Sequence, residues 1–162
     1  TRGNFVDTSG AVGSDNVEKA FNFFVSTNLF TPEQSAGICG NLIQESNMNP
    51  TIKSGFAGEG SVGIAQWNPG QAAGNRLGQL KDFSNSRNLD WGSLETQLQF
   101  IVYELETVSY LGMAQLRSSR SLEEATTIFS RKYERPDPNH ERIGQRISYA
   151  KDVYETYYHQ QG

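Results

Sequence analysis

Hydrophobic residues recur along much of the chain at the spacing of one face of an α-helix. The first such stretch starts at Asp15, which with Glu18 has the spacing of an N-terminal capping pair. The second begins at Thr31–Gln34, a capping threonine followed by proline at the first helical position, and is expected to run to about Glu45. Later stretches with the same spacing begin near Ser93, Ser121 and Ile143. The sequence therefore predicts a mostly helical protein.

The segment 53–70 breaks this helical pattern. It holds five glycines, at positions 55, 58, 60, 63 and 70, around the apolar run Val62–Trp67. Such a segment predicts tight turns and a short β-hairpin or small sheet. We therefore expect an α+β, mostly helical fold in which the small hairpin or sheet follows the second helix. Residues 1–13 lack periodicity and are expected to form a linker or N-terminal arm, with one domain over 14–162.

Composition and charge exclude several classes of function. The chain has 14 basic and 18 acidic residues, a net charge of −4, and no block of basic residues, which disfavours a nucleic-acid partner. No apolar run approaches the roughly 18 residues of a membrane span, so no membrane partner is expected. The one cysteine, Cys39, and the histidines His140 and His159 lack a zinc-binding spacing. We expect neither a metal nor a cofactor, and we interpret Cys39 as a buried small hydrophobe.

Glu45 carries the clearest chemical signal in the sequence. It follows Leu42 by three residues and Ile38 by seven, which places its side chain on the apolar face of a helix near its end. Partial burial there would raise the pKa of the carboxyl group and suit a general acid. The alternatives are a glutamate at the surface and one paired with an arginine.

Glu59 is the candidate for a second carboxylate. Because Gly58 and Gly60 flank it, the backbone there can approach a ligand closely. Two carboxylates on either side of a cleft are the groups that cleave glycosidic bonds, although the residues alone favour a solvated loop glutamate at position 59. Gln66 and Trp67 supply an amide and an indole suited to a sugar, but tryptophan is also a common core residue.

The segment Tyr133-Glu134-Arg135-Pro136 ends a predicted helix. It could place a phenol and a guanidinium group at the wall of a binding site. The alternative is a structural pair of Glu134 and Arg135, followed by a proline that stops the helix.

Together these segments resemble the phage tail lysozyme family, whose members degrade peptidoglycan and have a lysozyme-like fold. The resemblance extends from about Asn16 to Tyr154. The motifs that carry it, in chain order, are Gly40–Ser46 followed by Asn49-Pro50, Gly63–Trp67 and Tyr133–Pro136.

The resemblance implies roles for individual residues. Glu45 would be the catalytic acid. Glu59 is the only acidic residue between Glu45 and Trp67, which makes it the default second carboxylate. The residues implied to bind substrate are Ser46, Gln66, Trp67 and Tyr133.

The resemblance also implies an activity and a place of action. The protein would be a bacteriolytic lysozyme, a muramidase that hydrolyses the β-1,4 bond between N-acetylmuramic acid and N-acetylglucosamine in bacterial peptidoglycan. It would be tethered to other phage tail domains or proteins in the virion and act on the host cell wall, without a cofactor. The alternatives are a lytic transglycosylase acting on the same bond, a non-catalytic glycan-binding module and a structural tail protein.

Overall fold

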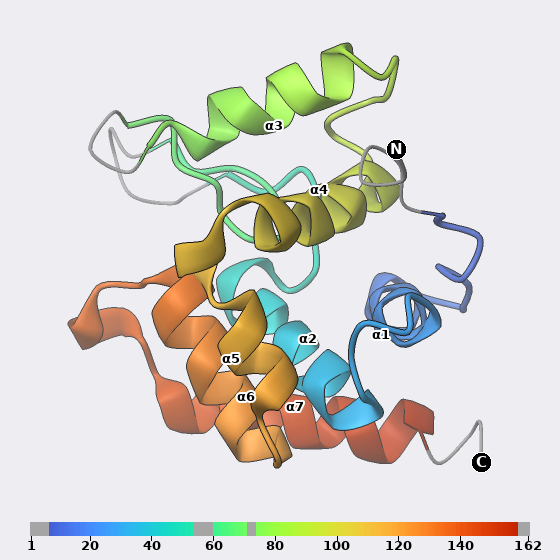
Figure 1. Cartoon of the computed structure of the whole chain (residues 1–162), viewed down its shortest axis with the longest axis vertical. Helices are drawn as coiled ribbons and strands as arrows, with labels where there is room; N and C mark the ends of the chain where they lie inside the picture. The colour runs from blue at the N-terminus through green and yellow to red at the C-terminus, as the bar shows by residue number, and fades with distance from the viewer. Residues whose placement is uncertain (1–6, 54–59, 71–73, 159–162) are drawn as a thin grey trace.

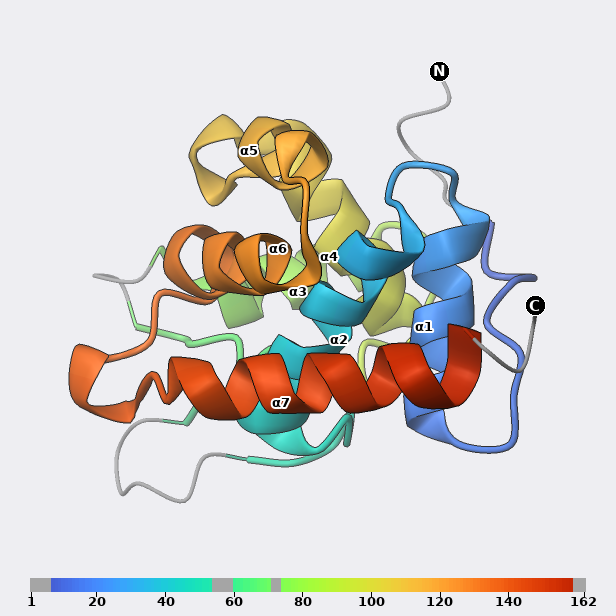
Figure 2. The same ribbon diagram turned by 90° about the horizontal axis from the view of Figure 1, so that it is seen from below.

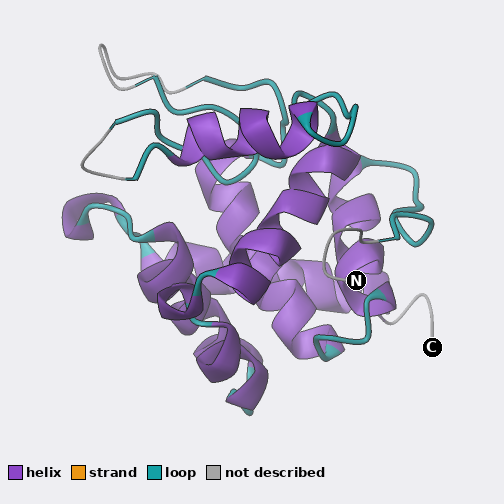
Figure 3. Ribbon diagram, turned by 45° about the horizontal axis from the view of Figure 1, so that its top comes forward, coloured by secondary structure: helices purple, strands orange, loops and turns teal. Residues whose placement is uncertain are grey.

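The computed structural model describes residues 7–53, 60–70 and 74–158, and most of these residues are helical (Figures 1 and 3). The main helices are α1 (Asn16–Ser26), α2 (Pro32–Ser46), α3 (Arg76–Asn85), α4 (Leu94–Thr107), α5 (Met113–Ser118), α6 (Leu122–Ile128) and α7 (Ile143–Val153). Short helical segments are η3 (Ser109–Leu111), η4 (Phe129–Glu134), η5 (Pro138–His140) and η6 (Tyr154–Tyr158). The described helices include none long and apolar enough to cross a membrane.

The capping signals in the sequence start the helices where they were predicted. The Asp15 side chain accepts from the backbone N–H of Glu18 at 2.9 Å, although the Glu18 carboxylate accepts from Ser14 and not from Asp15. Thr31 and Gln34 form the complete reciprocal pair, with bonds of 3.1 and 3.0 Å. The capping pair fixes where α2 begins, and the C-terminal end of the same helix carries Glu45.

Helix α2 is the centre of the fold. It packs against α1, α6 and α7, and Figure 2 shows α7 running alongside it. Gly40 permits this closeness, because a Cβ at that position would lie 2.5 Å from the carbonyl oxygen of Arg146 and 2.8 Å from the Cβ of Ala150. The contact between α2 and α7 places Glu45 next to Arg146, a residue 101 positions later in the chain.

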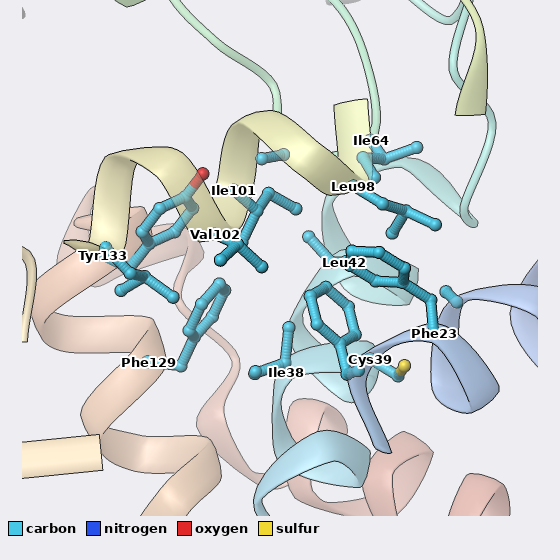
Figure 4. Packing of buried hydrophobic residues seen from close by; sticks show 14 of the residues in the cluster. Phe23, Ile38, Cys39, Leu42, Ile64, Leu98, Ile101, Val102, Phe129 and Tyr133 are labelled. Carbon is cyan, nitrogen blue, oxygen red and sulfur yellow. The ribbon is translucent and has the colours of Figure 1, made fainter. Parts of the chain in front are cut away.

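The hydrophobic core lies between α2, α1, α4 and the end of α6 (Figure 4). Cys39 is fully buried in it, which confirms the interpretation of this residue as a small hydrophobe. Burial raises the pKa of its thiol. Core residues labelled in the figure are Phe23, Ile38, Cys39, Leu42, Ile64, Leu98, Ile101, Val102, Phe129 and Tyr133.

Helix α3 is not predicted by the sequence pattern, and it packs on α4 (Figure 1). Asn75 caps it from a left-handed backbone conformation, with φ of 50°, and accepts from the N–H of Gly78. Its buried residues Leu77, Leu80 and Phe83 recur every three positions, a spacing that a glycine-containing segment makes hard to recognise. This helix matters for the site because Arg76 is its first residue.

The predicted β-hairpin or small sheet, and with it the α+β class, is wrong, since the described part of the chain contains no strand. Two isolated antiparallel bridges join Val62 to Lys53 and to Trp67. Residues 63–66 form a turn, with positive φ of 94° at Gly63 and 57° at Gln66. Left-handed backbone at both ends of the turn interrupts the extended conformation that a ladder needs, so pairing stops at single bridges.

Candidate functional site

Glu45 lies one residue before the end of α2, where Asn47 adopts a left-handed conformation with φ of 54°. Its side chain is 17% exposed and its Oε2 accepts from Nη2 of Arg146 at 2.8 Å. The alternative of a glutamate paired with an arginine is therefore realised, together with the partial burial that a general acid needs. The Glu45 carboxylate therefore combines partial burial with a neighbouring positive charge.

Arg146 lies in α7 and is buried. All three nitrogens of its guanidinium group donate hydrogen bonds. Nη2 donates to Glu45, Nη1 donates to Oδ1 of Asn41 at 2.9 Å, and Nε donates to the carbonyl oxygen of Glu141 at 2.6 Å. The amide nitrogen of Asn41 in turn donates to the carbonyl oxygen of Thr126 at 3.0 Å. This network fixes the guanidinium group relative to α2 and α6, and so restricts the position of the Glu45 carboxylate.

Glu134 is the second carboxyl group of this site, and it ends the π-helical segment η4. The N–H of Arg135 donates to the carbonyl oxygen of Ser130, an i→i+5 bond of 2.8 Å. The residue as a whole is partly exposed, but its Oε2 is buried and has no hydrogen-bond partner among the described residues. Burial, and next the charge of Glu45, raise the pKa of Glu134 well above its usual range, so the structure favours its neutral form.

A buried network centred on Glu104 lies beside these groups. Its Oε1 accepts from the indole of Trp67 at 3.0 Å and from the hydroxyl of Tyr133 at 2.6 Å. Arg76 donates to both carboxylate oxygens at 2.8 Å and to the carbonyl oxygen of Tyr133 at 2.9 Å. Burial, and next the charge of Glu104, raise the pKa of Tyr133 well above its usual range. The network ties α3 and α4 to the helix end that carries Glu134.

Trp67 and Tyr133, both predicted to bind sugar, are 1% and 0% exposed. In the free protein they hold the Glu104 carboxylate in place. Their contact with a sugar stays a prediction.

Ser46 and Gln66 connect the end of α2 to the turn at 63–66. The Ser46 hydroxyl is buried and donates to the carbonyl oxygen of Ile64 at 2.8 Å. The Gln66 amide, which is partly exposed, donates to the carbonyl oxygen of Gly63 at 3.0 Å. Both residues therefore position the turn beside Glu45, and their contact with substrate stays a prediction.

Glu59 lies outside the described residues, so its predicted pairing with Glu45 stays a prediction. Among the described residues, Glu134 is a carboxyl group whose pKa the charge of Glu45 raises. The described parts of the chain contain no group of three or more histidine, cysteine, aspartate or glutamate residues arranged to hold a metal ion.

Four charged residues of the site, Arg76, Glu104, Glu134 and Arg146, were not predicted from the sequence as site residues. Two of them carry the same signal as Glu45. Arg146 follows Ile143 by three residues and precedes Ala150 by four, so it lies on the apolar face of α7. Glu104 follows Ile101 by three residues on α4. Glu134 is different, because it ends the π-helical segment η4, whose i→i+5 spacing does not follow the pattern of an α-helix.

Comparison with known families supplies the context for this site. A family model described as phage tail lysozyme matches residues 15–157, which is most of the chain and includes every residue of the two charged networks. The match supports a phage-associated, lysozyme-like function in the degradation of cell-wall peptidoglycan. The helical architecture is consistent with a lysozyme-like class.

Proposed function

The chain belongs to the phage tail lysozyme family, and from that premise we propose that it hydrolyses the β-1,4 bond between N-acetylmuramic acid and N-acetylglucosamine. The observation that carries this proposal is the placement of Glu45. Its carboxyl group is partly buried, remains accessible from solvent and is held by a fixed guanidinium group. General acids of glycosidases need such a site, in which one carboxyl can reach the substrate while its surroundings control its proton.

In the proposed reaction, protonated Glu45 donates its proton to the glycosidic oxygen as the bond from that oxygen to the anomeric carbon breaks. One sugar leaves as an alcohol, and positive charge develops on the other. Glu59 remains our candidate for the group that stabilises this charge, activates water or attacks the anomeric carbon. Water then supplies the hydroxyl group of the second product and returns a proton to the site.

The ion pair with Arg146 opposes the acid role of Glu45, because a nearby cation favours the ionised carboxylate over the protonated form that an acid needs. The position of Glu45 at the C-terminal end of α2 acts in the opposite direction, because the carbonyl groups there disfavour a negative charge. A neighbouring carboxylate favours protonation as well, and Glu134 is such a neighbour.

The proposed role of Glu45 is tested with Glu45→Gln, which keeps the shape of the side chain and removes the proton. We expect the clearing of a suspension of purified peptidoglycan to slow by roughly 10² to 10⁴, the usual contribution of a general acid. Glu155→Gln, at an exposed position of η6, is the matched control and should clear at the wild-type rate. A Glu45→Gln variant that keeps most of its activity would contradict the assignment.

Mass spectrometry of the released fragments tests the reaction type. Hydrolysis adds one water to each cleaved bond, whereas a lytic transglycosylase leaves a 1,6-anhydro sugar that lacks that water. Wild-type protein that binds peptidoglycan without clearing it would instead indicate a glycan-binding module.

We further propose that the domain is tethered to other phage tail proteins and acts from the virion on the host wall. The net charge of −4 supports this, because bacterial walls are largely anionic and the isolated domain should bind them weakly. Tethering to the tail would raise the local concentration of the domain at the wall, which would compensate for its weak affinity.

A further inference from the structure

A buried glutamine, Gln97, joins three segments of the chain that lie outside the helices. It belongs to the first turn of α4, and its side chain is fully buried. Its Oε1 accepts from the backbone N–H of Ile64 at 2.9 Å. Its Nε2 donates to the carbonyl oxygens of Pro50 at 2.8 Å and of Trp91 at 3.0 Å. The side-chain amide of Gln97 is therefore bonded to the backbone at three separate places.

The turn at 63–66 is held from two sides through Ile64. The N–H of Ile64 donates to Gln97 on α4, and its carbonyl oxygen accepts from the hydroxyl of Ser46 at 2.8 Å. Figure 4 shows Ile64 beside Leu98, the residue that follows Gln97. Because Ser46 directly follows Glu45 at the end of α2, the position of the turn relative to the proposed acid depends on both bonds.

Gly63 allows the Gln97 side chain to approach the turn closely. A Cβ at this position would lie 3.0 Å from Oε1 of Gln97 and 2.9 Å from the ring of Trp67, and the φ of +94° is one that glycine adopts without strain. The N–H of Gly63 donates to the carbonyl oxygen of Ile52 at 3.0 Å. The turn is thus packed against Gln97 and also bonded to the segment that follows α2.

We propose that Gln97 is a positioning residue, which holds the turn at 63–66 beside the end of α2 before a glycan strand binds. The inference rests on the proposed function, in which Glu45 acts on such a strand. The partly exposed amide of Gln66 is the group of this turn that we predict to contact a sugar. A turn that is already ordered binds more tightly, because the substrate does not have to order it. Gln97 itself is buried and acts only through the turn.

A buried glutamine at the opposite end of α2 offers a matched control. Gln34 is 3% exposed, and its Oε1 accepts from a backbone N–H at 3.0 Å. Its Nε2 donates to the carbonyl oxygens of Arg117 at 3.1 Å and of Ser119 at 3.2 Å. Gln34 therefore makes the same set of bonds as Gln97. It precedes Glu45 by 11 residues, which is roughly 16 Å along a helix.

The test compares Gln97→Met with Gln34→Met, since methionine keeps the length of the side chain and removes its three hydrogen bonds. Each variant leaves buried backbone groups unpaired, so both should raise the unfolding equilibrium constant by roughly 10- to 100-fold, measured in urea. Only Gln97→Met should weaken binding to purified peptidoglycan, by more than about tenfold in a sedimentation assay. Equal affinities for peptidoglycan in the two variants would overturn the proposal.

The clearing reaction gives a second readout that a general loss of stability would not produce. Gln97→Met should raise the peptidoglycan concentration that gives half the maximal rate, because binding is weakened. Its maximal rate should change little, because Arg146 and not Gln97 holds the Glu45 carboxylate. A lower maximal rate at an unchanged half-saturating concentration would contradict the proposed role.

Hydrogen exchange covers the case in which Gln97→Met does not fold. In the wild type the N–H of Ile64 should exchange as slowly as the core amides of α4, although it lies in a turn, because a buried side chain holds it. Exchange as fast as that of exposed loop amides would overturn the proposal. In folded variants, Gln97→Met should accelerate this exchange and Gln34→Met should leave it unchanged.

This proposal and the proposed function fail in different ways. If the wild type binds peptidoglycan but releases no fragments, hydrolysis is refuted, and the binding of Gln97→Met and Gln34→Met still decides the role of Gln97. If the wild type cleaves and the two variants bind equally well, the positioning role is refuted and hydrolysis stands. A wild type that neither binds nor cleaves peptidoglycan would refute both.

Discussion

Replacement of Arg146 by methionine should destabilise the protein more than almost any other single substitution. Methionine keeps much of the length and apolar packing of arginine but removes all three hydrogen bonds of the guanidinium group. It leaves the Glu45 carboxylate without its ion-pair partner and Oδ1 of Asn41 without its donor. It also removes a positive charge that acts on Glu134.

The size of the effect follows from the burial of the pair. Removing one partner of a buried ion pair costs about 3–5 kcal/mol, whereas a domain has a total stability of about 5–15 kcal/mol. For a chain of this size each kcal/mol lowers the melting temperature by about 2–4 °C, so we expect a decrease of about 6–20 °C. Arg146→Lys keeps the charge but cannot span three acceptors, and should lose about 2 kcal/mol.

Urea unfolding at neutral pH, followed by tryptophan fluorescence, measures these changes. Arg131→Met is the matched control, because that side chain is 61% exposed, although it also pairs with a glutamate, Glu141, at 3.3 Å. It should alter the free energy of unfolding by less than about 1 kcal/mol. In a Glu45→Gln background the cost of Arg146→Met should shrink by about 0.5–3 kcal/mol, which isolates the pair. A loss below about 1 kcal/mol for Arg146→Met in the wild-type background would refute this account of how α2 and α7 are joined.

Three other positions give predictions that thermal or urea unfolding can check. Gly63→Ala should cost about 1–3 kcal/mol, because φ is +94° and a Cβ would lie 2.9 Å from the ring of Trp67. Gly144→Ala is its counterpart in α7, where a Cβ meets no atom within 4 Å, and it should stabilise by about 0.5–1 kcal/mol. Glu104→Gln should cost about 3–5 kcal/mol, because it removes the buried carboxylate that pairs with the largely buried guanidinium of Arg76. A neutral effect of Glu104→Gln would contradict the role of this network.

The helices whose signals are local could be predicted from the sequence. The box at Thr31 and Gln34 starts α2 with both predicted hydrogen bonds, and Ser93 and Ser121 cap α4 and α6. Helix α3 was missed because its three buried apolar residues, Leu77, Leu80 and Phe83, lie in a short segment that is otherwise polar and contains a glycine. The hairpin was wrong because glycine and apolar residues at 62–67 are equally compatible with a tight turn, and the positive φ of Gln66 is not visible in the sequence.

The candidate site was only partly predictable. The position of a charged residue on an apolar helix face singled out Glu45, and the same criterion applies to Arg146 and Glu104. It does not identify their partners, because the bonds of Arg146 to Glu45 and of Glu104 to Trp67 join residues 101 and 37 positions apart. The π-helical segment that ends at Glu134 also leaves no signature in a pattern based on 3.6 residues per turn.

By itself the sequence therefore determined which segments are helical, where the strongest caps lie and which carboxyl group is the candidate acid. These properties depend on residues within a few positions of one another. Tertiary structure decided that Trp67 and Tyr133 support a buried carboxylate, that Arg146 holds Glu45, and that Glu134 is its neighbour. These outcomes depend on how α2, α4 and α7 pack, because packing alone sets which charges share a desolvated space and how strongly each retains its proton.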